Sequence, residues 1–515
     1  MSRYVVGVDL GTSGCKVALV DEQMRCIATS RQTYAEGSAI QKHPGWVDQD
    51  PDAWVAAAKR GIREAAKAAE NGKIEAISFS GQMHGLIALD AKGEVIRPCI
   101  TCADGRTEEQ CQEIYERLGG KERGRKKLLE CTNNYMFPSF TASKILWMKE
   151  NEPENYERLS VAINPKDYLR YKLTGIIGTD VSDACGFGLF DCKNNVWSQE
   201  ILDAIGIPAS ILPKVTESDA VVGTITSECA DELGLPDDVK IVAGGGDAVT
   251  QTTGCGAVLP GIFTITLGTG ALVGASFETY RDNPLGTPQM FRSNSAGRYM
   301  AFGGTGSGGG ALAWLQQKFF SAEKEIADAT GENVFSVMSR EAETVSAGCE
   351  GLMFYPMLVG QRCPFEDADT CGGYIGMRMI HEKRHLVRAL MEGVALCLMD
   401  NYDVIHSMCG DIKQLSVTGG GASSDLWCQI FADAFGAEVV RYSSCSHGGA
   451  MGACMIAGCG VGIWRDLPHA ASLMQVDKTF QPDERMHEKY LQLLKIYQQL
   501  YPSLKQIFHD IMRMQ

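Results

Sequence analysis

Apolar residues with branched side chains gather in two short runs near the start of the chain. Val5 to Val8 and Val17 to Val20 predict two β-strands. The small, flexible residues from Gly11 to Gly14 lie between the runs and predict a tight turn. The chain is therefore expected to begin with an antiparallel hairpin.

The polar residues of this hairpin suit a phosphate. Such a turn can direct backbone N–H groups, the hydroxyls of Thr12 and Ser13 and the ammonium of Lys16 into one small volume. Asp9, at the end of the first strand, would face the same place and suits a hydrated Mg²⁺. The alternative is an ordinary hairpin in which Asp and Gly serve only the turn geometry.

A similar pattern returns about half a chain later. The stretch "GIFTITLGTGALVGASFE", Gly261 to Glu278, again predicts two strands, which are joined here by Leu-Gly-Thr-Gly. Aligning this sequence with the first turn makes Gly268 equivalent to Gly11. Two such hairpins predict two related halves, residues 1–247 and 248–515, that hold a nucleotide from both sides.

Further glycine-rich turns follow strands in the second half. Leu415 to Thr418 predicts a short strand, followed by three glycines and a helix from about Ser424. In Gly303 to Leu315 the glycines also lead into a helix. Glycines at a strand-to-helix turn let a ligand approach the backbone, and the helix N-terminus adds a favourable dipole. A flexible loop or close helix packing is the alternative for each.

One acid follows a third run of glycines. Val239 to Ala243 predicts a buried strand, and three glycines join it to Asp247 at the start of a predicted helix. We expect this carboxylate to stay ionised, because the helix dipole favours its charge. Near a nucleotide it can take the proton of a substrate hydroxyl as that oxygen attacks the γ-phosphate. Helix capping is the alternative, although it does not explain the three glycines.

Length and charge limit the class of protein and its partners. The 515 residues exceed the roughly 250–300 at which a single core stops growing, so two domains are expected. The net charge of −15 argues against a nucleic-acid partner. The chain shows neither a leader pattern nor an apolar run of roughly 20 residues, so we expect a cytoplasmic location and no membrane partner.

The cysteines and the C-terminal residues add two smaller expectations. Nineteen scattered cysteines predict reduced thiols, and a redox or metal role for the single pair Cys99 and Cys102 is the less favoured alternative. The second half is expected to end near Gly460, with only an amphipathic helical tail after it. A packed terminal helix is expected there, and a homodimer contact is the alternative.

Several stretches together resemble a known family. They are "GVDLGTSGCK", "HPGWVDQDP", "ISFSGQMHGLIALD", "DGRT", "SFTASKILWMKEN", "PKDYLRYKLTG", "TDVSDACGFGLFD", "GGGD", "LGTGA" and "GGGAS". The chain resembles the FGGY carbohydrate kinases from end to end, and "GQMHG" is most similar to their xylulokinase branch. The resemblance implies an α/β fold of two duplicated domains, of the sugar kinase, Hsp70 and actin (ribonuclease H-like) type, with the nucleotide in the cleft between them.

The resemblance also implies ATP and Mg²⁺ as cofactors and a small sugar as the substrate. It places Asp247 as the general base, with Asp9 and Asp247 at the metal. The other implied contacts are Thr12, Ser13 and Lys16 with Gly268 and Thr269 at the phosphates, Gly309, Gly421, Ala422 and Asp425 at the nucleoside, and Met83, His84, Asp104 and Asp247 at the sugar.

Two of these sugar-site assignments have plain alternatives. From its small, flexible neighbours, His84 is expected to donate a hydrogen bond to a sugar hydroxyl, and a structural histidine is the alternative. Asp104 and Arg106 of "DGRT" would lie near the pocket, and a surface turn with a salt bridge is the alternative.

Three positions depart from the xylulokinase pattern. Those enzymes typically carry Trp-Asn before "DGR" and Asn after the catalytic acid, where this chain has Cys102, Ala103 and Ala248. Both changes remove groups that would touch the sugar, so the pocket is expected to be roomier and poorer in donors.

The favoured function is ATP-dependent phosphorylation of a small sugar, D-xylulose or a related ketose. Ribulose, gluconate, glycerol or a tetrulose as substrate is the alternative within the same fold. An ATP-binding chaperone-like protein and a catalytically silent sugar sensor are the non-enzyme alternatives, and the retained Asp9, Asp247 and both hairpins argue against the sensor.

Overall fold

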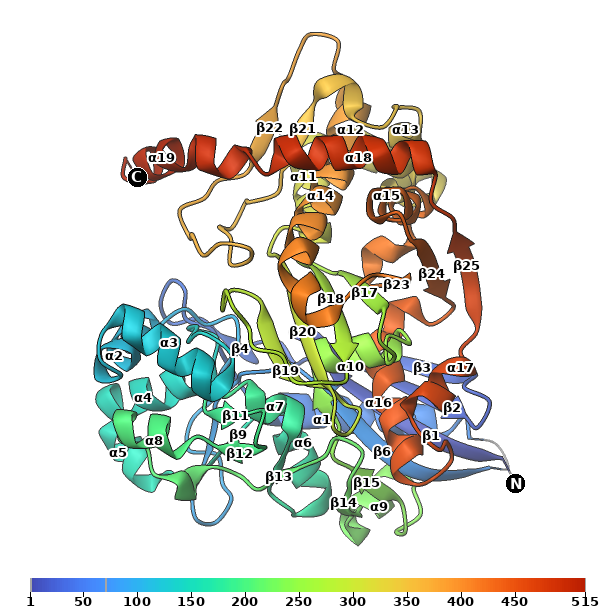
Figure 1. The fold of residues 1–515 in the computed structure, drawn as a ribbon. Helices are drawn as coiled ribbons and strands as arrows, with labels where there is room; N and C mark the ends of the chain where they lie inside the picture. Colours follow the sequence, from blue (N-terminus) through green and yellow to red (C-terminus); the bar gives the residue numbers. More distant parts are fainter. Residues whose placement is uncertain (1, 70–71, 515) are drawn as a thin grey trace.

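The first of two seven-stranded sheets begins with the predicted hairpin. This computed structural model describes residues 2–69 and 72–514 (Figure 1). The strand order of the first sheet is β14 (Val221–Thr224), β15 (Lys240–Val242), β6 (Lys73–Gly81), β1 (Arg3–Leu10), β2 (Gly14–Asp21) and β3 (Cys26–Thr33), and β16 (Gly245–Gly246) pairs with the end of β6.

The second sheet repeats this topology. Its order is β19 (Gln289–Arg292), β20 (Tyr299–Thr305), β18 (Ala271–Phe277), β17 (Ile262–Leu267), β23 (Gln414–Thr418), β24 (Glu438–Tyr442) and β25 (Val476–Phe480). β1 pairs antiparallel with β2 and parallel with β6, as β17 does with β18 and β23. Leu10 and Leu267 end the equivalent strands, so the predicted duplication is confirmed. The boundary at residues 247 and 248 lies between the two sheets and stays a prediction.

The side chains of β1 alternate between two helical layers. Val6 and Val8 pack in one apolar cluster with α1 (Pro51–Ala66), whereas Val5 belongs to another cluster with α16 (Gly448–Gly460). Since both faces of the sheet are covered, nearly every residue of the strand is apolar.

Helix α16 touches the first sheet and α10 (Asp247–Gly254) backbone to backbone. A Cβ atom added to Gly254 would lie 1.9 Å from the carbonyl oxygen of Gly448, and one on Gly449 would lie 2.5 Å from Cγ of Asp9. Only glycine allows these approaches. The helix that begins at Asp247 is therefore locked in place beside Asp9.

Helices and short strands surround the first sheet. At the lower left of Figure 1 a helical lobe contains α2 (Glu108–Arg117), α3 (Lys121–Thr132), α4 (Thr141–Asn151), α5 (Pro153–Arg158) and α8 (Gln199–Ile205). One small sheet contains β4 (Ala39–Ile40), β5 (Asp48–Gln49) and β8 (Cys99–Ile100). Three pairs of short strands are β7 (Ile87–Leu89) with β9 (Val161–Ile163), β10 (Thr179–Asp180) with β13 (Val215–Thr216), and β11 (Phe190–Asp191) with β12 (Val196–Trp197). The remaining helices of this half are α6 (Pro165–Thr174), α7 (Val181–Cys185) and α9 (Ser227–Leu233).

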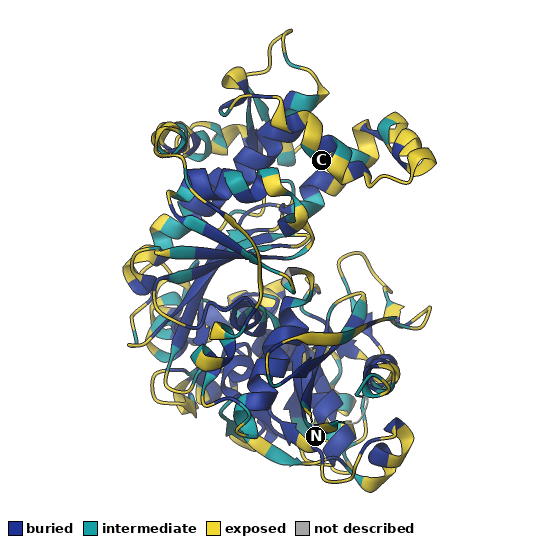
Figure 2. Ribbon diagram, turned by 90° about the vertical axis from the view of Figure 1, so that its right-hand side faces the viewer, coloured by how far each residue is buried: buried dark blue, intermediate teal, exposed yellow. Residues whose placement is uncertain are grey.

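The second sheet is covered by the longest helix of the described chain. This helix, α14 (Lys383–Cys409), packs across β18 and β20. The central strands of both sheets are buried, whereas the edge strands β3 and β25 and the outer faces of the surrounding helices are largely exposed (Figure 2). The remaining elements of this half are α11 (Gly309–Phe319), α12 (Ser321–Thr330), α13 (Val334–Glu343), β21 (Met353–Tyr355) with β22 (Gly373–Ile375), α15 (Asp425–Phe435), α17 (Leu467–Ser472), α18 (Glu484–Tyr497) and α19 (Leu500–Met512).

The C-terminal residues correct one expectation. Tyr490 and Leu494 on α18 are buried, so the packed helix that their spacing predicted is confirmed, whereas on the last helix, α19, only Phe508 is buried. The expectation that only helices follow Gly460 is wrong, because β25 pairs antiparallel with β24 at the edge of the second sheet. In β25 only Phe480 is buried, so the apolar alternation that marks a strand is absent from its sequence. A homodimer contact through the tail stays a prediction.

None of the helices in residues 2–69 and 72–514 combines the length and the apolar character needed to cross a membrane.

Candidate active site

Two carboxyl groups, that of the buried Asp9 and that of the partly buried Asp247, meet where β1 ends and α10 begins. Asp9 accepts a hydrogen bond of 2.8 Å from the hydroxyl of Ser80. Burial raises the pKa of Asp9, although the Ser80 hydroxyl and the charge of Lys16 oppose the shift. Both aspartates come from the segments where the sequence predicted them.

The pKa of the Asp247 carboxyl group is raised by its surroundings. Burial, and next the negative charge of Asp9, raise its pKa to about 7, against hydrogen bonds from the backbone of Ala248 and Met83. The expectation that the helix dipole keeps Asp247 ionised is therefore wrong, because burial and the second acid outweigh the dipole. The N-cap is Gly246, and Asp247 occupies the first helical position.

The same pair fits a divalent cation. Carboxylate oxygens are the ligands that Mg²⁺ prefers, and a cation beside these two neighbouring acids would relieve their repulsion. The pKa values of both groups are raised, which shows that the protein atoms alone do not offset the cost of two negative charges here. Asp9 and Asp247 are thus suited to hold Mg²⁺.

The first predicted hairpin has an exposed tip. The amide of Gly11 donates to the carbonyl oxygen of Gly14 at 3.1 Å, which closes the turn and leaves Thr12 and Ser13 open to solvent. The ammonium of Lys16 donates to the carbonyl oxygen of Ser446 at 3.2 Å, so it reaches across to the segment before α16.

The second hairpin opens onto a cavity of about 720 Å³. Five of the predicted nucleotide residues line it together, namely Gly268, Thr269, Gly309, Gly421 and Asp425. Ala422 is fully buried and is absent from the lining, and its carbonyl oxygen accepts a hydrogen bond from Arg441 at 3.1 Å. Ala422 therefore faces the interior behind the cavity wall.

Glycines join the second hairpin to the start of α11. The amides of Gly308 and Gly310 each donate to the carbonyl oxygen of Thr269 at 2.9 Å. A Cβ atom on Gly309 would lie 2.6 Å from the carbonyl oxygen of Gly268. The hairpin tip is thereby held at a helix N-terminus, where the dipole favours an anion.

The opposite wall of the cavity was missed from the sequence. Residues of α13 and the turn before it supply that wall, namely Asn333, Phe335, Ser336, Ser339, Arg340 and Glu343. They have no glycine-rich turn or charged motif among them, so no local signal marks them as part of a site.

Family comparison agrees with this geometry. Residues 4–254 match the N-terminal domain, and residues 263–461 the C-terminal domain, of the FGGY family of carbohydrate kinases. The chain belongs to this family. It is therefore a sugar kinase, an enzyme that phosphorylates a sugar with ATP.

Individual FGGY relatives are similar over their whole length. A xylulose kinase of Lactococcus lactis is 35% identical over 99% of this chain and 98% of its own. A ligand-bound xylulose kinase structure from Lactobacillus acidophilus has a TM-score of 0.89 at 27% identity, covering 99% of this chain and 100% of its own. A gluconate kinase structure from the same organism has a TM-score of 0.88 at 27% identity, with the same coverage.

In this FGGY kinase, His84 is held from several sides. Its carbonyl oxygen accepts hydrogen bonds from the ammonium of Lys144 at 3.0 Å and the hydroxyl of Thr141 at 3.1 Å. Its ring stacks on Phe140 with 4.8 Å between the centroids. The backbone of His84 has a φ of 68°, which costs energy for a residue with a side chain and persists only where the surroundings fix it.

The ring of His84 is set as a hydrogen-bond acceptor. Nδ1 lies 2.9 Å from the carbonyl oxygen of Gly186, and since a carbonyl only accepts, Nδ1 must carry the hydrogen. Burial lowers the pKa of His84 to about 3, so the ring is neutral and Nε2 keeps its lone pair. The expectation that His84 donates to a sugar hydroxyl is therefore wrong for Nε2, which can only accept.

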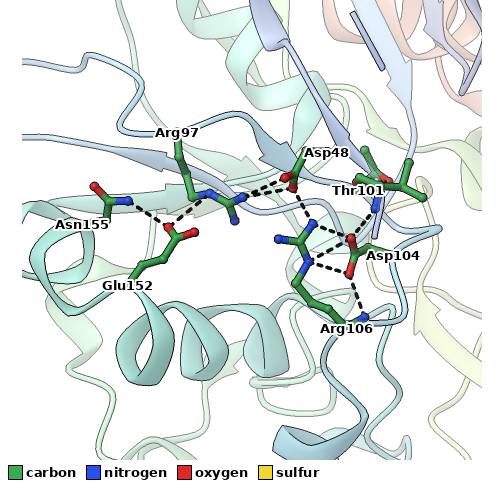
Figure 3. Close-up of polar contacts among 8 residues, drawn as sticks. Asp48, Arg97, Thr101, Asp104, Arg106, Glu152 and Asn155 are labelled. Carbon is green, nitrogen blue, oxygen red and sulfur yellow. Dashed lines mark hydrogen bonds and ion pairs between the residues drawn. The ribbon is translucent and has the colours of Figure 1, made fainter. Parts of the chain in front are cut away.

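The "DGRT" residues form a buried ionic network (Figure 3). The guanidinium of Arg106 contacts Asp104 and Asp48, each at 2.7 Å. It lies over the ring of Trp46 at 4.2 Å and that of Trp147 at 4.9 Å. The alternative of a plain surface turn is wrong, because the side chains of Asp104 and Arg106 are at most 1% exposed.

Two glutamines missed from the sequence link the predicted sugar and phosphate residues. Cys102 Sγ lies 3.8 Å from Oε1 of Gln82, whose Nε2 donates to Gln49 Oε1 at 3.2 Å. Gln49 in turn donates to the carbonyl oxygen of Thr12 at 3.0 Å. Both lie in the family stretches "GQMHG" and "HPGWVDQDP", which is the signal that could have marked them.

The C-x-x-C pair has no feature of a reactive site. Cys99 and Cys102 are free thiols. Burial raises the pKa of Cys102 to about 11 and raises that of Cys99 further. Since the thiolate is the reactive form, neither is set up for redox chemistry.

Proposed function

We propose that this kinase transfers the γ-phosphate of ATP to a hydroxyl of D-xylulose or a closely related ketose. The observation that carries the proposal is the pair of carboxyl groups formed by Asp9, on the phosphate hairpin strand, and Asp247, at the start of α10. The xylulose kinases among the similar proteins support this sugar, and the similar gluconate kinase makes gluconate the second candidate.

Asp247 is the proposed general base. With a pKa of about 7 it can accept a proton from the attacking hydroxyl and release it again at neutral pH. Asp9 and Asp247 would hold Mg²⁺, which when bound offsets phosphate charge and favours the ionised form of both acids.

The proposed ATP site uses both hairpins. The hydroxyls of Thr12 and Ser13 and the ammonium of Lys16 hold the phosphates from one side, and Gly268 and Thr269 hold them from the other. The nucleoside occupies the cavity lined by Gly309, Gly421 and Asp425, with Ala422 supporting its wall from the interior. This placement aligns the γ-phosphate for in-line transfer.

The proposed sugar site lies around His84. Nε2 of His84 accepts from a sugar hydroxyl, and Met83 packs against the Gly246 turn that carries Asp247. Asp104 contributes through its contacts: Arg106 and the amide of Val47 occupy both of its oxygens, so it fixes the wall of the pocket.

The cytoplasm is the proposed location of the enzyme. The free thiols of Cys99 and Cys102 support it, since such thiols persist in reducing compartments.

The proposal is tested with a coupled ATPase assay against pentuloses, hexuloses, gluconate and alditols. Turnover that depends on D-xylulose or a stereoisomer is expected. ATP hydrolysis that no sugar stimulates would instead support a chaperone-like protein, and sugar binding without turnover would support a sensor.

The pH dependence of kcat/KM is expected to report Asp247. Activity should rise with pH through a midpoint near 7, because the base must be ionised and its pKa in the free enzyme is about 7. Raising the Mg²⁺ concentration should move the midpoint to lower pH, since the cation favours the carboxylate. A profile that is flat from about pH 5.5 to about pH 8 at low Mg²⁺ would contradict the assignment.

The sugar preference is expected to depend on Cys102 and Ala248. Ala248 lacks the amide that xylulokinases typically carry, and an unpaired substrate hydroxyl costs roughly 1–3 kcal/mol. Ala248→Asn, alone and with Cys102→Trp, should therefore raise kcat/KM for xylulose by about 10-fold relative to its stereoisomers. Ala103→Asn alone serves as a comparison. If the native enzyme already prefers xylulose strongly and the changes bring no improvement, the loss of donors does not control specificity.

A further inference from the structure

A cluster of fully buried charges lies behind the turn that ends at Asp247. The ammonium of Lys166 contacts carboxylate oxygens of Asp167 at 2.6 Å, Asp180 at 2.9 Å and Asp183 at 3.1 Å. All four side chains have an exposure of 0%. They come from the family stretches "PKDYLRYKLTG" and "TDVSDACGFGLFD", to which the proposed reaction assigns no role.

Asp180 connects this cluster to Ser182. While Lys166 holds Oδ1 of Asp180, its Oδ2 accepts from the hydroxyl of Ser182 at 2.7 Å and from the hydroxyl of Ser218 at 2.8 Å. The hydroxyl hydrogen of Ser182 is therefore committed to Asp180. This leaves the lone pairs of Ser182 Oγ to accept a hydrogen bond.

The group that donates to Ser182 is the turn before the proposed base. The amide of Gly246 lies 2.9 Å from Ser182 Oγ, and both groups are buried. On its other side Gly246 touches Met83, whose Cγ would lie 2.4 Å from an added Cβ. Gly246 is the N-cap of α10, so its position sets where Asp247 enters the helix.

We propose that Ser182 is a positioning residue for phosphoryl transfer: its hydroxyl, fixed by Asp180 and Lys166, holds the Gly246 amide and thereby the carboxylate of Asp247 in the cleft. This inference rests on the proposed role of Asp247 as general base. A reacting group displaced by about 1 Å can cost 10²-fold in rate, so one buried hydrogen bond next to the base has a large effect.

Ser182→Ala tests the inference in the full-length enzyme. It should lower kcat by roughly 10-fold or more and change the KM for sugar and for ATP by less than about 2-fold, because the lost contact acts on the chemical step. Ser143→Ala is the matched control, since its buried hydroxyl bonds to Thr107, Pro138, Phe140 and Cys111 rather than to Gly246. It should lose a comparable amount of thermal stability and keep its kcat.

A double-mutant cycle separates positioning from general destabilisation. If Ser182 acts through Asp247, then Ser182→Ala should have little further effect in an Asp247→Asn background. Equal losses in both backgrounds, or a wild-type kcat in folded Ser182→Ala, would overturn the inference. If Ser182→Ala does not fold, Ser182→Cys replaces it. Positioning is then supported if Ser182→Cys reduces kcat at unchanged KM in the otherwise native enzyme and causes no further reduction in the Asp247→Asn background. Full activity of Asp247→Asn alone would instead reject the proposed function.

Discussion

Asp247→Asn is expected to lower sugar-dependent turnover by at least about 10²-fold, the lower range for loss of a general base. Asparagine has the same size as aspartate, and its side-chain oxygen can still accept the hydrogen bond of 2.8 Å that the Ala248 amide gives to Asp247. It cannot take a proton from the sugar hydroxyl. Fold and nucleotide affinity should therefore stay nearly unchanged, as measured by thermal unfolding and by calorimetric titration with ATP.

An acid outside the proposed site whose pKa is also raised provides the control for this change. Asp433 lies on α15, and burial also raises its pKa, but among the hydrogen bonds of the described chain its carboxylate accepts only from Gln429 and Asp483. Asp433→Asn should keep most of the turnover. If Asp247→Asn also keeps most of its activity in a clean preparation, Asp247 has no part in proton transfer.

Lys166→Met is expected to destabilise the folded protein by about 3–5 kcal/mol, because it removes one partner of a buried ion cluster. Methionine fills most of the volume but leaves Asp167, Asp180 and Asp183 without the ammonium that contacts all three. The free energy of unfolding, measured by urea denaturation, checks this directly. Lys172→Met on the exposed side of the same helix α6 is the control and should change stability by less than about 0.5 kcal/mol.

The loss of stability should also depend on pH. In the native protein burial raises the pKa of Asp180, but Lys166 and the hydroxyls of its neighbours outweigh burial and hold that pKa below its usual value. Removing Lys166 takes away the largest of the effects that lower the pKa of Asp180, so burial is expected to raise its folded pKa above that of the unfolded chain, as it already does for Asp183. Stability that comes from such protonated acids is present at low pH and is lost as pH rises through the folded pKa. Lys166→Met should therefore be less destabilised near pH 5 than near pH 8, and equal stability of Lys166→Met and Lys172→Met at both would contradict the role of the cluster.

The sequence by itself determined the parts of this kinase that depend on neighbouring residues. Runs of branched apolar residues around Gly11 and Gly268 predicted both hairpins, and their likeness predicted the duplicated sheets. The glycines before Asp247 predicted a turn into a helix. Turn geometry and strand alternation are local properties, so one stretch of chain is enough to specify them.

Only the tertiary structure decided how the site groups behave chemically. Asp247 has a pKa near 7 because folding removes its carboxyl group from water and places it beside Asp9, which lies 238 residues away in sequence. His84 accepts rather than donates because its Nδ1 meets the carbonyl of Gly186, 102 residues along the chain. Likewise, Ser182 reaches Gly246 across 64 residues. Protonation and hydrogen-bond direction depend on burial and on partners distant in sequence, and these are set when the chain packs.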